Sequence, residues 1–224
     1  MAEDGRAMRF IFEQVRVGGD RNFGYLVGDR TEGAGILVDP SYAPETLVER
    51  ARLQGLGITH ILNTHGHADH ANGNARAKAL TGALLAGGPG HPGPLDLTLG
   101  DGDRIPCGAY TLRAWHVPGH SPDHLAFLVE DLAAGLTGDL LFVGKIGGTA
   151  TETDGRTERD SLQRLLRDWP PHATIWPGHD YGVRPSSTLD WERHFNPFLQ
   201  CADLESFLRL KRDWAGFKAR HGLM

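Results

Sequence analysis

Residues 64–70 of the 224-residue chain read Thr-His-Gly-His-Ala-Asp-His and follow an apolar run that predicts a β-strand. In an extended segment, residues two apart point to the same side, so His65 and His67 aim two imidazoles at one point. If the chain then turns into a helix, Asp69 and His70 bring a carboxylate and a third imidazole to a second point nearby. Imidazole and carboxylate bind borderline divalent metal ions. The stretch therefore predicts a metal site at the end of a strand, in preference to a solvated loop that happens to hold three histidines.

Three later stretches each contain one residue of a metal-binding type, a histidine or an aspartate, directly after a glycine. They are Pro-Gly-His120-Ser-Pro, Thr-Gly-Asp139 and Pro-Gly-His179-Asp-Tyr. Together with residues 64–70, and in this order, they resemble the metallo-β-lactamase superfamily, whose first motif is T-H-x-H-x-D-H. The resemblance extends over nearly the whole chain.

The resemblance implies both a fold and a ligand set. The implied fold is α/β, a four-layer αββα sandwich in which two sheets lie face to face, with helices outside and the site at one edge. One metal ion would be held by His65, His67 and His120, a second by Asp69, His70 and His179, with Asp139 bridging the two. Zinc is the expected metal, with iron or manganese as alternatives, since all three tolerate nitrogen and oxygen ligands. Divalent ions lower the pKa of bound water and so supply hydroxide, with Asp69 and Asp139 as catalytic residues that fix the ions and orient that hydroxide.

The rest of the chain predicts strands and helices in both halves, which favours helices flanking packed sheets. Strands are expected at 8–17, 21–28, 34–38, 58–63, 95–99, 110–117, 125–129 and 174–176, and helices at 45–54, 75–80 and 160–169. Gly18-Gly19-Asp20 predicts a hairpin between the first two strands. The tail repeats an apolar residue every three or four positions, at Phe207, Leu210, Trp214 and Phe217, which predicts a docked helix. We expect residues 1–185 to form the catalytic domain and residues 186–224 a short helical appendage packed on it.

The composition excludes several classes of partner. Lys and Arg number 23 against 28 Asp and Glu, a formal charge of −5, so nucleic acid is not an expected partner. No run approaches the ~18 apolar residues of a membrane span, and the start, Met-Ala-Glu-Asp-Gly-Arg, lacks the order of an export signal. We therefore expect a cytoplasmic protein without a membrane partner. Cys107 and Cys201 have no C-x-x-C neighbour and are interpreted as buried, inert thiols.

The last part of the chain narrows the substrate. Residues 177–198 are similar to glyoxalase II (hydroxyacylglutathione hydrolase) and to the related persulfide dioxygenases. The resemblance implies a glutathione site made by Tyr181 and by an R-x-x-K-D-like motif, Arg209-Leu-Lys-Arg212-Asp213. A solvated helix face is the alternative reading of the two arginines. Residues 144–149, Gly-Lys-Ile-Gly-Gly-Thr, depart from the G-C-G-K/R pattern of glyoxalase II and from the basic-Thr-Asp sequence of the dioxygenases.

Two enzyme classes stay open. The first is a metal-dependent hydrolase that attacks a thioester such as a glutathione thioester, or another small ester or lactone, with metal-bound hydroxide. The second is a persulfide dioxygenase with one Fe(II) bound by two histidines and one aspartate. A non-catalytic module is disfavoured because no ligand of the set is missing, and the hydrolase is our expectation. His124 has two open roles, orienting a ligand or packing within its strand. Surface or core positions without metal are expected for His60, His91, His116, His172, His194 and His221.

Overall fold

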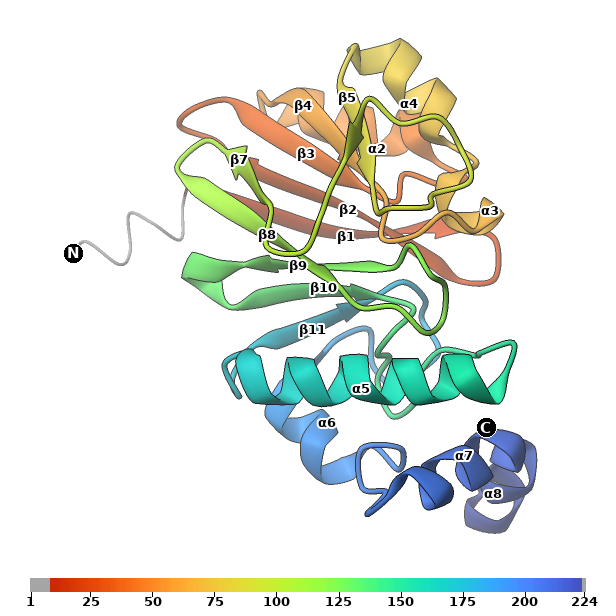
Figure 1. Cartoon of the computed structure of the whole chain (residues 1–224). Coiled ribbons are helices and arrows are strands. Elements are labelled where there is room, and N and C mark those ends of the chain that lie inside the picture. The colour runs from red at the N-terminus through yellow and green to blue at the C-terminus, as the bar shows by residue number, and fades with distance from the viewer. Residues whose placement is uncertain (1–8, 223–224) are drawn as a thin grey trace, which may run out of the picture.

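The computed structural model describes residues 9–222, and within this range the chain forms two six-stranded sheets (Figure 1). The first sheet contains β1 (Phe10–Gly18), β2 (Asn22–Asp29), β3 (Ala34–Val38), β4 (Gly57–Leu62), β5 (Leu84–Gly87) and β6 (Leu97–Thr98), in that spatial order. Strands β1 to β3 pair antiparallel, and β3 to β6 pair parallel. The predicted hairpin joins β1 to β2.

The second sheet contains β7 (Arg104–Cys107), β8 (Tyr110–His116), β9 (Leu125–Val129), β10 (Ala134–Gly138), β11 (Thr174–Pro177) and β12 (Ser187–Thr188). Its strands pair antiparallel except β10 with β11, which pair parallel. The 3-10 helix η1 (Glu130–Leu132) joins β9 to β10.

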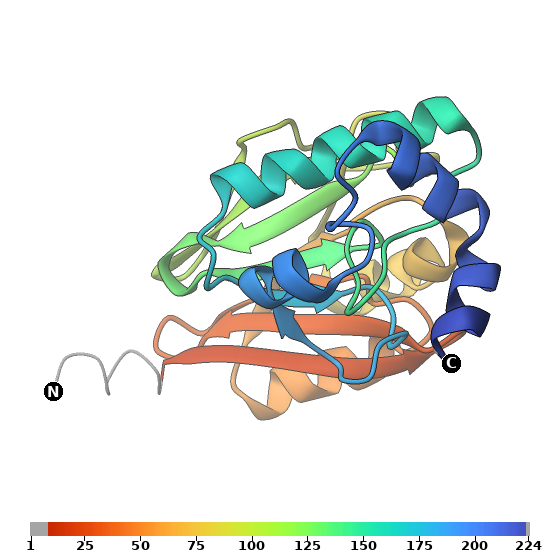
Figure 2. The ribbon, with the colours of Figure 1, turned by 90° about the horizontal axis from the view of Figure 1, so that it is seen from below.

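Helices cover the outer faces of both sheets. They are α2 (Pro44–Leu53) and α4 (Asn74–Thr81) on the first sheet, and α5 (Glu152–Asp168), α6 (Leu189–Phe195), α7 (Leu204–Arg212) and α8 (Trp214–His221) on the side of the second. The one-turn helix α3 (Ala68–Ala71) lies at one edge of the sandwich (Figure 1). Figure 2, seen from below, shows α5 to α8 together on the side of the second sheet that faces away from the first.

Three buried apolar clusters hold these layers together. Ile36 and Phe127 belong to the cluster between the two sheets. Leu47 of α2 lies in the cluster on the outer face of the first sheet, and Leu165 of α5 in the cluster that joins the second sheet to the C-terminal helices. Strands β2 and β9 are buried along their whole length because side chains on both of their faces are covered. This arrangement confirms the predicted four-layer α/β sandwich and the presence of a C-terminal helix.

Helix α5 is longer than the sequence predicts. It begins at Glu152, not near residue 160, and its N-cap is Thr151. The Thr151 hydroxyl accepts from the backbone N–H of Asp154, whose carboxylate in turn accepts from the Thr151 N–H. The first two turns are polar and contain Gly155, so hydrophobic periodicity does not reveal them.

Other element boundaries also differ from expectation. The predicted strand at 95–99 is only the two-residue β6, while β5, β7, β10 and β12 are strands that the pattern does not single out. The tail forms two helices that meet at Asp213, where the sequence predicts one. The predicted strand at 8–17 begins at Met8, which lies outside the described residues. The first six residues, on which the expected localisation depends, lie outside them too. Within residues 9–222, the structure contains no helix long and apolar enough to cross a bilayer.

Candidate metal centre

The predicted ligands lie in loops and one short helix that follow strand ends. His65 and His67 come after β4, His120 after β8, Asp139 after β10 and His179 after β11. Asp69 and His70 lie in α3, which begins directly after His67. Strands of both sheets therefore deliver their following residues to one edge of the sandwich.

The loop between β4 and α3 is fixed by neighbours on both sides. The Gly66 N–H donates to Asp123 Oδ2 at 2.7 Å. A Cβ at Gly66 would lie 2.1 Å from Cδ of Pro92, so only glycine allows this close approach. His65 and His67, on either side of Gly66, are thus held in place by backbone packing.

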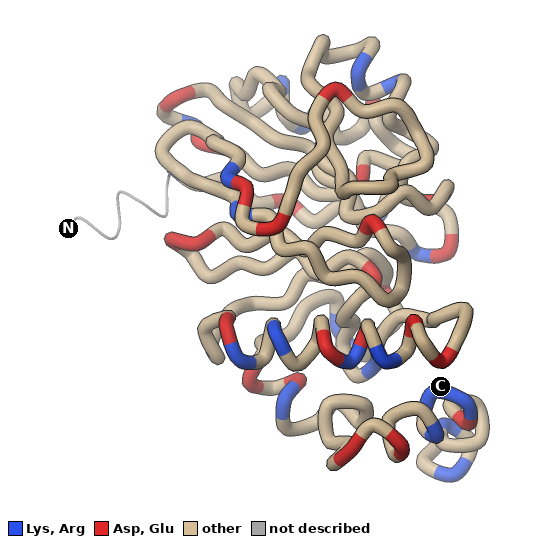
Figure 3. The backbone as a smooth tube through the Cα atoms, in the orientation of Figure 1, with Lys and Arg blue, Asp and Glu red and all other residues tan. Residues whose placement is uncertain are grey.

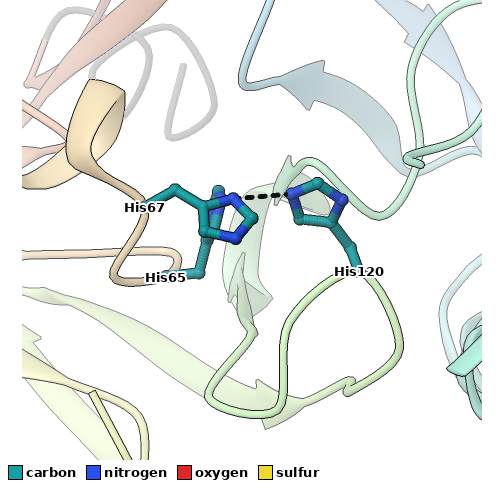
Figure 4. Close-up of side chains that lie close together, drawn as sticks. All are labelled: His65, His67 and His120. Carbon is teal, nitrogen blue, oxygen red and sulfur yellow. Dashed lines mark hydrogen bonds between the residues drawn. The ribbon is translucent and has the colours of Figure 1, made fainter. Parts of the chain in front are cut away.

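The first group of donors consists of three imidazoles, drawn in Figure 4. Nδ1 of His67 lies 2.9 Å from Nε2 of His65 and 3.0 Å from Nε2 of His120. One proton on His67 Nδ1 can satisfy only one of these two contacts. Three ring nitrogens therefore converge on a point where a cation fits better than a proton.

The second group consists of Asp69, His70 and His179. Nε2 of His70 lies 3.2 Å from Nε2 of His179, which is 3.4 Å from Asp69 Oδ2. Asp139 lies between the two groups, because its Oδ2 is 3.3 Å from His179 Nε2 and 3.6 Å from His120 Nε2. Its Oδ1, 3.4 Å from His70 Nε2, is buried and makes no hydrogen bond in the described structure.

The outer nitrogens of the rings indicate where their protons lie. Nδ1 of His70 donates to Asp39 at 2.9 Å, Nδ1 of His179 donates to the Asp20 carbonyl at 2.8 Å, and Nδ1 of His120 donates to the Gly148 carbonyl at 2.8 Å. With the proton on Nδ1, each neutral ring directs an Nε2 lone pair inward. That is the tautomer a metal ligand needs, and the donor set fits two divalent cations.

His65 has the same arrangement through Thr64. The Thr64 hydroxyl donates to Asp39 Oδ2 at 2.6 Å, so its oxygen accepts from His65 Nδ1 at 3.1 Å. The inner Nε2 of His65 is again left without a proton.

The charges of the site favour a cation in the second group. Burial lowers the pKa of His70, but the carboxylates of Asp139 and Asp39 outweigh it and raise that pKa well above its ordinary value. Burial also lowers the pKa of His179, but hydrogen bonds to Asp139 and Asp69 outweigh it and raise that pKa to about 9. In the first group, burial lowers the pKa of His65 and of His120. Positive charge is therefore stabilised beside the carboxylates, where a divalent ion would also be stabilised.

Three supporting residues were not singled out from the sequence. Asp39 is buried and accepts hydrogen bonds from the backbone and side chain of Thr64 and from His70. Asn22 donates to the carbonyl and the carboxylate of Asp69 at 3.2 and 3.0 Å. Asp123, as described, holds the loop at residue 66. The sequence signal for Asp39 is its position directly after β3, at the end of a strand.

His124 takes part in the site without joining either group. Its Nε2 accepts from the Asp139 backbone N–H at 3.0 Å, and its ring stacks on His65 at 5.0 Å. Of the two roles left open, this contact favours orienting a ligand. Within residues 9–222, the remaining histidines contribute no atom to these groups. They are His60, His91, His116, His172, His194 and His221.

The residues expected to bind substrate are only partly brought together. The Tyr181 ring stacks on His179 at 4.6 Å, and its hydroxyl donates to Asp20 Oδ2 at 2.7 Å. Arg212 lines a pocket of about 360 Å³ together with Lys145 and Lys211. Nζ of Lys145 lies 4.3 Å from the centre of the Tyr181 ring and so connects this pocket to the metal-binding edge.

Arg209 is exposed and does not line that pocket. Figure 3 shows further Lys and Arg residues along α7 and α8. Of the two cysteines, Cys107 is buried, which raises its pKa to about 12, whereas Cys201 is only half-buried.

Comparisons with known proteins relate the chain to one superfamily. The model of the metallo-β-lactamase superfamily matches residues 17–94. A hydroxyacylglutathione hydrolase of Rhodospirillum rubrum is 39% identical over 171 residues, which cover 75% of this chain. The chain spans only 65% of the length of that hydrolase. Persulfide dioxygenase ETHE1 of Homo sapiens is 32% identical over 208 residues, which cover 91% of this chain and 79% of that protein.

The fold has close counterparts among solved structures. The crystal structure of ETHE1 from Myxococcus xanthus superimposes with a TM-score of 0.84 at 27% identity, covering 91% of each chain. Sequence motifs, fold and relatives agree: the chain belongs to the metallo-β-lactamase superfamily.

Proposed function

We propose that the protein is a metal-dependent hydrolase that cleaves a thioester of glutathione, as its hydroxyacylglutathione hydrolase relatives do by name. One observation carries the proposal. Both donor groups are complete and meet at Asp139, and the hydrogen bonds to the outer nitrogens turn the inner nitrogens of His70, His120 and His179 toward the site.

Two divalent cations in this site, zinc or alternatively iron or manganese, would supply a hydroxide nucleophile at neutral pH and polarise the carbonyl under attack. The proposed ligands are His65, His67 and His120 for one ion, and Asp69, His70 and His179 for the other, with Asp139 shared. Asp69 is oriented by Asn22, and the backbone of Asp139 is held by His124. The ligand imidazoles are not free to act as bases, so Asp69 and Asp139 are the proposed catalytic carboxylates that orient the nucleophile.

The pocket beside this edge is lined by three cationic side chains and by Glu152, which pairs with Arg212 and which a substrate carboxylate would displace. Glutathione carries two carboxylates, and the guanidinium of Arg212 and the ammonium of Lys145 are suited to bind one of them. Lys145 supplies a positive charge although residues 144–149 depart from the glyoxalase II pattern. Because the Tyr181 hydroxyl donates to Asp20, its oxygen remains able to accept a hydrogen bond from a substrate N–H.

A second candidate function is persulfide dioxygenation with a single Fe(II). The observation in its favour is coverage, since the ETHE1 structure from Myxococcus xanthus matches 91% of this chain and 91% of its own. That chemistry needs two imidazoles and one carboxylate of the set and leaves the other donors without a role.

One experiment separates the candidates. The purified protein is loaded with zinc, iron or manganese, its metal is counted, and two reactions are compared. We expect two ions per chain and thiol release from lactoylglutathione. One iron per chain with oxygen uptake on glutathione persulfide would replace the hydrolase with the dioxygenase. Activity on neither substrate would overturn the glutathione thioester and leave another small ester or lactone to be tried.

A further inference from the structure

The C-terminal helices hold the loop that follows β10, at residues 144–148. Oε2 of Glu192 accepts from the Gly144 N–H at 2.8 Å, and Nδ2 of Asn196 donates to the Lys145 carbonyl at 3.1 Å. From α7, Nζ of Lys211 donates to the Gly147 carbonyl at 2.8 Å. Backbone groups along this loop are therefore fixed by side chains from more than 40 residues further along the chain.

Lys211 lies inward, unlike the neighbouring Arg209. Its side chain is 12% exposed and pairs with Glu158 of α5, which is 0% exposed. Burial outweighs the opposing effect of Lys211 and raises the pKa of Glu158 to about 8. A buried lysine–carboxyl pair loses much hydration, so by itself it contributes little to stability.

The pair lies directly behind the first group of donors. A Cβ at Gly147 would be 3.0 Å from Nδ1 of His120 and 3.1 Å from Oε1 of Glu158, so both side chains lie against this glycine. The next residue, Gly148, supplies the carbonyl that accepts from His120 Nδ1. A chain of contacts thus runs from α7 through two consecutive residues of the loop to a proposed metal ligand.

We propose that Lys211 is a positioning residue: by anchoring the Gly147 carbonyl it sets the place of the Gly148 carbonyl, and so the ring orientation and tautomer of His120. The inference rests on the proposed metal centre and adds a role for the C-terminal helix beyond contact with substrate. Partners behind metal-bound histidines typically change metal affinity by about 10- to 100-fold when removed.

The test measures metal affinity, not turnover, on the full chain. Lys211→Met is titrated with zinc against a competing chelator. We expect the affinity for one of two ions to fall by about tenfold or more, with the other unchanged. Lys218→Met, the same substitution on α8, is the matched control and should leave both affinities unchanged.

Two further variants separate positioning from folding. Glu158→Gln keeps the Lys211 contact to Gly147 and should retain both affinities. Lys211→Met combined with Glu158→Gln removes the buried pair together, which avoids an unpaired buried charge and should still weaken one ion. In metal-free protein labelled with ¹⁵N, His120 should be protonated on Nδ1 in wild type and become a mixture of tautomers in both Lys211 variants.

The outcomes distinguish the two proposals. Wild type that binds two ions, with Lys211 variants of unchanged affinity and unchanged His120 tautomer, overturns the role of Lys211 alone. Wild type that binds no metal overturns the metal centre and this inference with it.

Discussion

Asp39 lies behind two of the proposed ligands, His70 and, through the Thr64 hydroxyl, His65. Both Asp39 oxygens accept hydrogen bonds, whereas an amide accepts through one atom only, so its NH2 group would face either the Thr64 N–H or the His70 Nδ1–H. We expect Asp39→Asn to weaken metal binding by about 10- to 100-fold in chelator competition. Asp190→Asn, at the exposed start of α6, is the control and should bind metal as wild type does. Equal affinities in the two variants would contradict the role of Asp39.

The clustering of the proposed ligands could be predicted from the sequence, whereas the residues that support them could not. His65, His67 and Asp69 lie within one short stretch, where spacing alone indicates a shared direction. Asp39 reaches Thr64 only because β3 and β4 pair in parallel. The residue pattern within either strand does not predict which strands pair. Lys211 stands between two arginines in the sequence, and only the structure shows that it turns inward.

The raised pKa of His179 predicts a pH dependence. Burial lowers this pKa, but hydrogen bonds to Asp139 and Asp69 raise it to about 9, above the ordinary value of 6.5. In the metal-free protein, the stabilisation from this proton is fully present below about pH 6.5 and is lost as the pH rises through about 9. Thermal unfolding of metal-free protein from pH 6 to 10 should show a falling Tm.

The same proton competes with metal. Because binding releases it, affinity for the divalent ion should rise with pH over this window, by up to about tenfold per pH unit for each proton displaced. Affinity that stays constant from pH 6 to 9 would contradict a ligand role for His179.

At the scale of elements, α5 depends on a cap that lies well before its apolar positions. Thr151 and Asp154 form a reciprocal capping box at its start. We expect Thr151→Ala to lower the free energy of unfolding by about 1 kcal/mol in urea denaturation. Thr157→Ala, within the same helix and outside the cap, serves as the control. A Thr151 variant as stable as this control would contradict the capping role.

Strands and helices could be predicted where apolar periodicity is strong, as at 34–38, which matches β3, and at 45–54, close to α2. Short buried strands such as β5 and β10 are not predicted, because their glycines and small residues give no alternation of apolar and polar side chains. The polar first turns of α5 are not predicted either, because the start of this helix is defined by a capping box and not by an apolar stripe.

At the scale of the whole molecule, we propose that residues 186–224 are an appendage packed on the catalytic part. Leu189, Phe198 and Phe207 share one buried cluster with Leu162 and Leu165 of α5. Arg212 extends from this appendage into the pocket beside the metal-binding edge. The appendage would therefore contribute to substrate binding as well as to the core.

Arg212→Ala tests that contribution. Removing a guanidinium that binds a substrate carboxylate should raise KM for lactoylglutathione by about tenfold and leave kcat nearly unchanged. Arg209→Ala, on the same helix but away from the pocket, should leave KM unchanged. An unchanged KM in the Arg212 variant would remove the appendage from the binding site.

The most direct test of the proposed centre is the number of divalent ions bound per chain, measured by elemental analysis after zinc loading and dialysis. Two ions are expected in wild type, and one in each of His120→Ala and His179→Ala, because these residues belong to different donor groups. Wild type with fewer than two ions, or variants that still hold two, would contradict the two-metal site.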